Sequence, residues 1–190
     1  MRRAPVLLAL SASRGCILAL AAGALVAAAT SCTSFDVGAF TEVTGPDYGQ
    51  FKQVSTTSAG KPVYGVSVVL ERRCGTLDCH GQAGRPLRLY GQYGRRFIDD
   101  AGDQPGLQAT TETEHEANYQ SVIGLQPELI TEVVQGNAQP DALLLLRKPL
   151  QLERHKGGAV IIAGDDADNC ILSWLAGKTD YTACTSAVGQ

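Results

Sequence analysis

The chain of 190 residues is poor in methionine, in long apolar runs and in basic clusters. Met1 is the only methionine, so a methionine sulfur is not available as a metal ligand beyond the first residue. The longest apolar run, residues 16–29, is shorter than the about 20 residues that a transmembrane helix needs. The first 31 residues hold three arginines, which leaves 13 basic against 19 acidic residues in the remainder, a net charge of −6. An acidic chain without a basic, aromatic patch is not expected to bind nucleic acid.

Signatures of enzymes are also missing. His115 is not followed four residues later by the second histidine of a zinc protease helix, and no serine lies in a G-x-S-x-G turn. The aspartates at 165, 166 and 168 lack the glycine and glutamate of an EF-hand, and helix capping explains them. We therefore expect a protein that is not an enzyme.

Residues 1–31 have the features of an export signal: early arginines, an apolar run and small residues at its end. The sequence Ala29-Thr30-Ser31-Cys32 resembles a bacterial lipobox, in which the cysteine becomes the lipidated N-terminus, although Ala29 stands where Leu or Val is usual. We expect lipidation of Cys32, which would carry palmitate-type acyl chains. The alternative is cleavage near residues 27–29, which leaves Cys32 as a free or paired thiol.

The remainder divides into a tether and a domain. Residues 32–61 are rich in Ser, Thr, Gly and Asp without a helical or strand period, which predicts a flexible tether. The alternative for the chain around Phe40 and Phe51 is short strands that pack onto the domain. Residues 62–190 predict a small, mainly α-helical domain with long loops. The expected segments are a helix or extended lead at 66–73, helices at 114–122 (capped by Thr113), 127–134, 141–147 and 165–176, and a turn at 155–158.

The motif Cys74-Gly75-Thr76-Leu77-Asp78-Cys79-His80 has the order of residues that attaches c-type haem. In such sites two thiols form thioethers and the histidine after the second cysteine binds the iron. The usual spacing is C-x-x-C-H, whereas here four residues separate the cysteines. Residues five apart on a helix are turned by roughly 140° from each other. The segment must therefore bulge out of helical form, which Gly75 permits.

Three stretches resemble c-type cytochrome domains of exported planctomycete and myxobacterial proteins. They are Cys79-His80-Gly81 followed by Leu87-Arg88-Leu89, the segment DALLLLRKP at 141–149, and His155-x-Gly157-Gly158 ahead of the helix with Trp174. The resemblance implies a cytochrome-c-like fold, haem c as cofactor and a role in electron transfer. It assigns Cys74 and Cys79 to the thioethers and His80 to the proximal position on the iron.

Two histidines remain as candidates for the second axial ligand of the iron. His155 lies in a glycine-rich turn, whereas His115, between two glutamates, is expected on a solvated helix face. We favour ligation by His80 and His155, with a five-coordinate iron as the alternative. A turn histidine that only bonds backbone would explain His155 as well.

The cysteines admit other uses in an oxidising compartment. Cys74, Cys79, Cys170 and Cys184 allow three disulfide pairings, of which Cys170–Cys184 is within reach of a folded-back tail. A Cys74–Cys79 disulfide would compete with haem attachment. A Cys2His2 zinc site with His80 and His155 is disfavoured, because ligands adjacent in the chain fit one tetrahedral ion poorly.

The function that we predict is that of an exported, lipid-anchored electron carrier with a periplasmic redox partner. The alternative is a haem-free structural or interaction lipoprotein stapled by disulfides. Thr33, next to the lipidated cysteine, is not the aspartate that retains lipoproteins in the inner membrane. We therefore expect the protein in the cell envelope, attached to the outer membrane and facing the periplasm.

Replacement Cys32→Ala should release the protein from membranes. A single acyl chain binds weakly, but the several chains of a lipoprotein attach it stably, so the wild-type protein should partition into detergent and the variant into the soluble fraction. Detergent phase separation followed by immunoblotting measures the difference. A wild-type protein found in the soluble periplasmic fraction would contradict the expected anchor.

Overall fold

The computed structural model describes residues 42–97, 106 and 108–189. Within these ranges the chain forms seven α-helices and one two-stranded sheet, which confirms the predicted mainly α class. The export signal, Cys32 and the first part of the expected tether lie outside the described residues. No helix in the described part of the chain is both long and apolar enough to cross a membrane.

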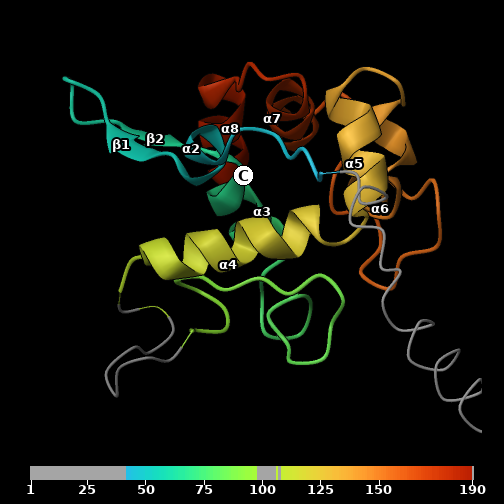
Figure 1. Ribbon diagram of the computed structural model, residues 1–190. Coiled ribbons are helices and arrows are strands. Elements are labelled where there is room, and N and C mark those ends of the chain that lie inside the picture. The colour runs from blue at the N-terminus through green and yellow to red at the C-terminus, as the bar shows by residue number, and fades with distance from the viewer. Residues whose placement is uncertain (1–41, 98–105, 107, 190) are drawn as a thin grey trace, which may run out of the picture. The chain divides into compact units, whose positions relative to one another are not determined.

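Helix α3 (Val66–Arg73) is the centre of the core (Figure 1). The sequence leaves helix and extended chain open here, and the segment is helical up to Cys74. Val66, Val69 and Leu70 recur at the spacing of one helix face and are at most 1% exposed. Around α3 pack α2 (Tyr48–Lys52), α4 (Glu112–Ile123), α7 (Asp166–Leu175) and α8 (Tyr181–Val188).

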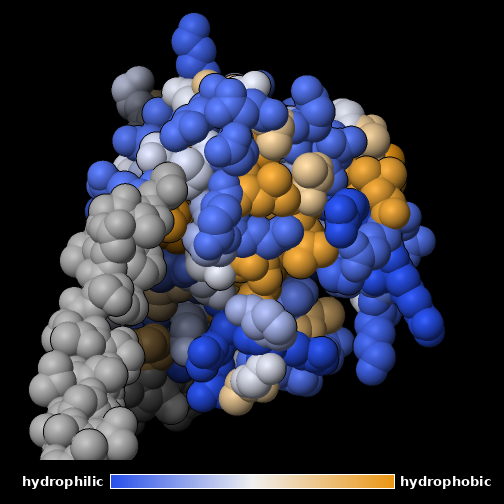
Figure 2. Space-filling view, turned by 45° about the vertical axis from the view of Figure 1, so that its right-hand side comes forward, coloured by the Kyte–Doolittle hydropathy of each residue, from blue (hydrophilic) through white to orange (hydrophobic). Residues whose placement is uncertain are grey.

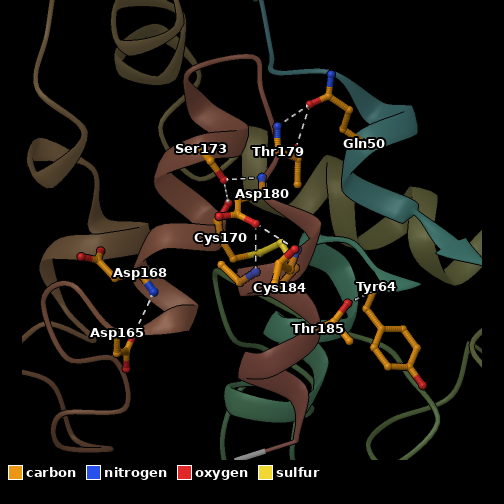
Figure 3. Close-up of a disulfide and its surroundings, with 12 residues drawn as sticks. Gln50, Tyr64, Asp165, Asp168, Cys170, Ser173, Thr179, Asp180, Cys184 and Thr185 are labelled. Carbon is orange, nitrogen blue, oxygen red and sulfur yellow. Dashed lines mark hydrogen bonds between the residues drawn. A yellow bond between two sulfur atoms is a disulfide. The ribbon is translucent and has the colours of Figure 1, made fainter. Parts of the chain in front are cut away.

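Helices α7 and α8 form a disulfide-linked pair (Figure 3). Of the two aspartates that the sequence offers as the cap of helix α7, Asp165 and Asp166, the N-cap is Asp165, whose side chain accepts a hydrogen bond from the Asp168 amide. Gly177, with φ of +77°, terminates this helix. The predicted Cys170–Cys184 disulfide is present. The tail does not fold back as irregular chain but forms α8, capped by the side chain of Asp180.

Helix α5 (Pro127–Val134) has the predicted bounds and begins with proline in its first turn. The next predicted helix, 141–147, is interrupted. A 3₁₀ turn (Pro140–Ala142) is followed by extended backbone at Leu143, with φ of −69° and ψ of 135°, before α6 (Leu144–Arg147) begins. The break buries Leu143 together with Leu145 and Leu146 of α6, which a continuous helix would turn to different sides.

The prediction of a flexible tether is wrong for residues 42–61, the part of the tether that the structure describes. From Glu42 onward the chain belongs to the same compact unit as the rest of the domain. Strands β1 (Val54–Thr56) and β2 (Pro62–Tyr64) form an antiparallel hairpin after α2. Phe51 is fully buried with its ring 5.2 Å from that of Trp174, and Trp174 Nε1 donates to the Asp47 carbonyl at 2.9 Å. These long-range contacts outweigh the local polar composition.

Helix α4 starts earlier than predicted and buries a different face. Its N-cap is Thr111, not Thr113, and Thr111 forms a capping box with Glu114. The solvated face expected for His115 is also wrong, because His115 is 5% exposed and Glu114 is fully buried. Burial of Glu114 is possible because Arg96 donates to both of its carboxylate oxygens at 2.8 Å.

Removal of the α7–α8 disulfide should lower the free energy of unfolding by about 3 kcal/mol, since the bond closes a loop of 14 residues. Urea denaturation of Cys184→Ala under non-reducing conditions measures the loss. Replacement of either cysteine removes the bond. The double variant Cys170→Ala/Cys184→Ala should therefore lose little more free energy of unfolding than Cys184→Ala alone. Additive losses, or free thiols at both positions in the wild-type protein, would show that the bond does not form.

Candidate functional site

The segment from Cys74 to Gly81 leaves α3 as a compact chain of turns. The His80 amide donates to the Cys74 carbonyl at 2.9 Å, while the amides of Cys79 and Gly81 both donate to the Thr76 carbonyl at 3.0 Å. The four residues between the cysteines thus fold into a turn instead of continuing the helix, in agreement with the predicted bulge. The backbone bonds hold His80 beside the end of α3.

Gly81 is required where this loop closes on itself. A Cβ atom at this position would overlap the Gly75 carbonyl oxygen and lie 2.8 Å from the Thr76 carbonyl oxygen. Both neighbours are backbone atoms, so they cannot rotate away as a side chain would. Glycine at 81 therefore sets the path of the chain directly after His80.

The imidazole of His80 is held in one tautomer. Its Nδ1 lies 2.9 Å from the Leu87 carbonyl oxygen, which can only accept, so Nδ1 carries the proton. Burial lowers the pKa of His80 below its usual value, which favours the neutral ring at neutral pH. In that state Nε2 has a free lone pair. A hydrogen bond from the remote nitrogen to a carbonyl is also the arrangement that orients metal-binding histidines.

His155 repeats this arrangement in the predicted turn. Its Nδ1 lies 2.9 Å from the Gly158 carbonyl oxygen, and the Gly158 amide donates to the His155 carbonyl at 3.2 Å. Gly158 has φ of +74°, a conformation that favours glycine. The interpretation of His155 as a turn histidine that bonds backbone is therefore correct, and the same bond leaves its Nε2 available.

The rings of His80 and His155 lie close together in nearly parallel planes. Their centroids are 6.2 Å apart and their planes lie within 12° of parallel. This separation is too long for direct ring stacking. Both side chains line the same cavity, so the two imidazoles belong to one site.

Two cavities adjoin this histidine pair. One, of about 230 Å³, is mainly apolar, and the other, of about 520 Å³, opens toward Cys79. The view in Figure 2, which brings the α5 and α6 side forward, shows hydrophobic side chains at the surface among hydrophilic ones. Four residues line both cavities: Cys74, His80, Arg85 and His155. The apolar cavity adds Pro86, Leu87, Leu125, Leu144, Leu145, Lys148 and Pro149, and the larger one adds Arg73, Asp78, Cys79, Lys156, Gly157 and Val160.

The two cysteines of the motif are free thiols. The predicted competitor, a Cys74–Cys79 disulfide, is not formed. Burial raises the pKa of the Cys74 thiol to about 12, so at neutral pH it is protonated and not a thiolate of the kind that binds zinc. Within the described residues, no three or more His, Cys, Asp or Glu side chains are grouped so that they hold a metal ion. A metal between His80 and His155 thus needs further ligands from a non-protein group.

The rim of the site is basic although the domain as a whole is acidic. Arg85 and Lys148 line the apolar cavity, and Arg73 and Lys156 line the larger one, where Asp78 is the single acidic residue. Lys148 also pairs with Glu153 at 2.6 Å. A ligand with an apolar body and an acidic edge would find complementary surfaces here.

Four of the residues that line these cavities were named as candidates from the sequence: Cys74, Cys79, His80 and His155. Sequence reasoning missed the leucines of the apolar cavity as site residues, although the run of four leucines at 143–146 is visible in the sequence. It also missed Arg85 and Lys148, which are spread over loops without a shared motif. His115, the other candidate ligand, does not line either of these two cavities.

Comparison of the chain with models of protein families, with curated proteins and with solved structures finds no match. The function is therefore inferred from the residues of the site and their geometry.

Replacement Gly81→Ala should destabilise the domain by about 1–3 kcal/mol, the usual cost of forcing an added carbon into a packed site. Chemical denaturation measures the change. Gly189→Ala is the matched control, because its added Cβ meets only the Ser186 carbonyl oxygen at an ordinary 3.7 Å. Equal stability of the two variants would show that the close approach at Gly81 is absent in solution.

Proposed function

We propose that this protein is an electron carrier of the c-type cytochrome kind, with one haem covalently attached through Cys74 and Cys79. His80 and His155 would bind its iron. The observation that carries the proposal is that both cysteines and both histidines line one cavity, with the Nδ1 atom of each histidine engaged by a backbone carbonyl. The bound group supplies reversible transfer of one electron.

The donor set favours haem over an isolated metal ion. Two neutral imidazoles do not suffice to hold a metal, whereas a porphyrin provides the remaining equatorial ligands. Both cysteines line the larger cavity beside His80, as attachment through thioethers requires. The flanking cavities combine an apolar wall with a basic rim, which suits a planar apolar ring that carries carboxylates.

The residues of the chain would tune the carrier in three ways. The carbonyls of Leu87 and Gly158 hold the two imidazoles and increase the basicity of their Nε2 atoms. Leu125, Leu144 and Leu145 exclude water from one side of the site and lower its local dielectric constant. His80 and His155 would both hold the bound iron, which would leave no open position for a substrate and would suit the site to electron transfer rather than to catalysis.

The lipid anchor at Cys32 remains part of the proposal. It would keep the domain at the periplasmic face of the outer membrane, where it exchanges electrons with a periplasmic partner. A haem-free structural lipoprotein is the outcome to expect if the cysteines stay free or join in a disulfide.

Expression in the periplasm together with a haem-attachment system should yield a red protein whose colour survives acid and organic extraction. A mass increase of one haem on the intact chain measures attachment. Cys74→Ala combined with Cys79→Ala should abolish covalent attachment, because no thiol remains at the site. His155→Ala should convert the spectrum from that of a bis-histidine iron to that of an iron with an open or water-filled position.

Arg154→Ala is the matched control for His155→Ala, since it changes the exposed residue directly before His155, which lines neither cavity, without removing an imidazole. It should leave the spectrum unchanged. A colourless wild-type protein under these conditions would refute the proposal. If the protein binds haem and His155→Ala leaves its spectrum unchanged, the assignment of His155 as the second ligand is refuted.

A further inference from the structure

A buried carboxyl group lies one helical turn before Cys74. Glu71 belongs to α3 and is 8% exposed. Its Oε1 accepts a hydrogen bond from the Ser67 hydroxyl at 2.8 Å, and its Oε2 accepts one from the Thr110 hydroxyl at 2.6 Å. Both donors are neutral. A carboxylate removed from water and bonded only to hydroxyls is costly, so its protonated form is favoured.

The charged surroundings of Glu71 do not compensate its charge. Arg96 is the cation that favours its ionised form, but Arg96 forms a bidentate pair with Glu114, whose negative charge acts in the opposite direction. Burial raises the pKa of Glu71 to about 7, while the Thr110 and Ser67 hydrogen bonds oppose the rise. The other titratable or charged groups on the surrounding elements are His115 and Glu112 of α4, Lys52 at the end of α2, Arg72 of α3, Tyr64 of β2 and Tyr93 of the following loop.

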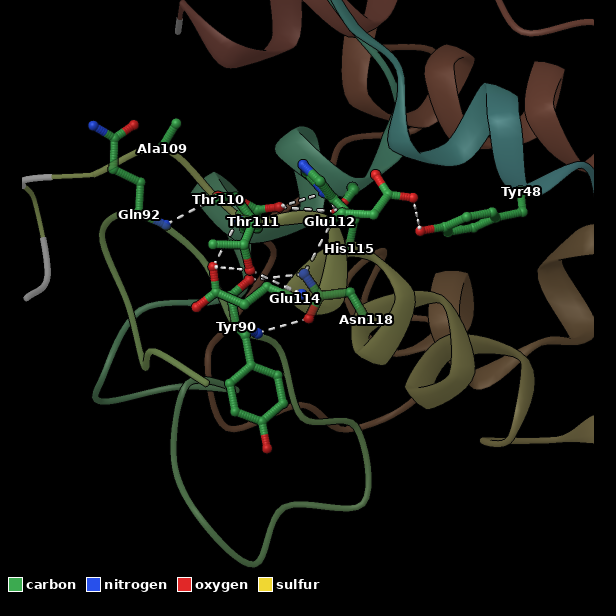
Figure 4. A network of polar contacts seen from close by, with 12 residues as sticks. Tyr48, Tyr90, Gln92, Ala109, Thr110, Thr111, Glu112, Glu114, His115 and Asn118 are labelled. Carbon is green, nitrogen blue, oxygen red and sulfur yellow. Dashed lines mark hydrogen bonds and ion pairs between the residues drawn. The ribbon is translucent and has the colours of Figure 1, made fainter. Parts of the chain in front are cut away.

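A chain of exchangeable groups joins Glu71 to solvent. The Ser67 hydroxyl lies 2.8 Å from His115 Nδ1 and contacts Glu71 at the same time, and His115 Nδ1 is 3.4 Å from Glu71 Oε1. His115, Thr110 and Glu71 line a surface cavity of about 240 Å³. Figure 4 shows Thr110 and His115 within this polar network. Burial lowers the pKa of His115, so its ring passes a proton on rather than holding it.

The same helical turn connects this carboxyl group to the site. The Cys74 amide donates to the Leu70 carbonyl at 2.8 Å and the Gly75 amide to the Glu71 carbonyl at 3.1 Å, so helical bonding continues to the cysteine. Side chains three residues apart on a helix have Cβ atoms roughly 5–6 Å from each other. A charge change on a group attached to Cys74 would act on Glu71 through the protein interior, where screening is weak.

We propose that Glu71 is a redox-linked proton site, which binds one proton when the haem iron gains an electron and releases it when the electron leaves. This inference rests on the proposed function. The electron comes from the redox partner and the proton from solvent through His115 and Ser67, and the ionised carboxylate becomes the neutral acid. Reduction removes one positive charge near Glu71 and so stabilises its protonated form. By reciprocity, protonation of Glu71 raises the reduction potential by the same free energy.

The test is the reduction potential of the haem-loaded protein between pH 5 and 9. For wild-type protein the potential should fall as the pH rises around neutrality, with a slope of at most about 59 mV per tenfold change in proton concentration. Glu71→Gln should remove this component, because the amide does not titrate. The carboxylates of the haem titrate in both proteins, so the difference between the two curves carries the result. In infrared difference spectra, reduction should produce a protonated-carboxyl band that Glu71→Gln lacks.

A second variant tests the direction of the effect. Thr110→Val removes a hydrogen bond that lowers the pKa of Glu71, so the pH-dependent region should move to higher pH. Thr113→Val changes an exposed threonine of α4 and should leave the curve in place. Identical curves for haem-loaded wild type and Glu71→Gln would overturn this inference and leave the proposed function intact. Failure of haem to attach would overturn the proposed function and this inference with it.

Discussion

Two backbone carbonyls fix the chemistry that the site is able to perform. The carbonyl oxygens of Leu87 and Gly158 each engage the Nδ1 atom of one histidine, so in both rings Nε2 is the nitrogen left for another partner. Neither bond depends on a charged side chain, and both lie in loops whose paths are set by glycines at 81 and 158. The orientation of the two imidazoles is therefore a property of the backbone and not of the surrounding side chains.

Helix α3 contributes both to the apolar core and to a buried polar network, and burial of polar groups has a cost in free energy that apolar packing does not. Its apolar face with Val66, Val69 and Leu70 forms the centre of the core, yet the same helix carries Ser67 and Glu71 into the interior toward α4. Burial of polar groups stabilises a fold only where each group finds partners. The partners come from Thr110 and His115, and the result is a carboxyl group poised near neutral pH instead of one that is firmly ionised.

Local signals predicted well those elements whose start and end are set by nearby residues. Pro127 and the Asp165 cap gave helices with nearly correct bounds, and the histidine turn follows from the glycines at 157 and 158. Prediction failed where a distant partner decides the outcome. Phe51 is held by Trp174, which the composition of a Ser/Thr-rich segment does not reveal.

The same reason explains the errors around α4 and the tail. A sequence of Glu, His and Glu looks solvated until Arg96, 18 residues earlier in the chain, is known to neutralise Glu114. Helix α8 carries mostly Ala, Thr and Ser, and its stability comes from packing against α7 and from the disulfide rather than from helix propensity. For the site, the motif near Cys74 identified His80 from local order. The pairing with His155 depended on there being only three histidines in the chain.

The contact between Asp47, Phe51 and Trp174 also constrains the order of events in folding. It joins the beginning of the described chain to a helix more than 120 residues later, and the Gln50 side chain reaches the Gly177 carbonyl and Thr179 across the same interval. Such long-range contacts require a large loop to close before they contribute stability, which slows folding. Because α7 and α8 are synthesised last, the segment around Phe51 has its partners only after most of the chain has been made, and until then its apolar side chains are exposed to aggregation.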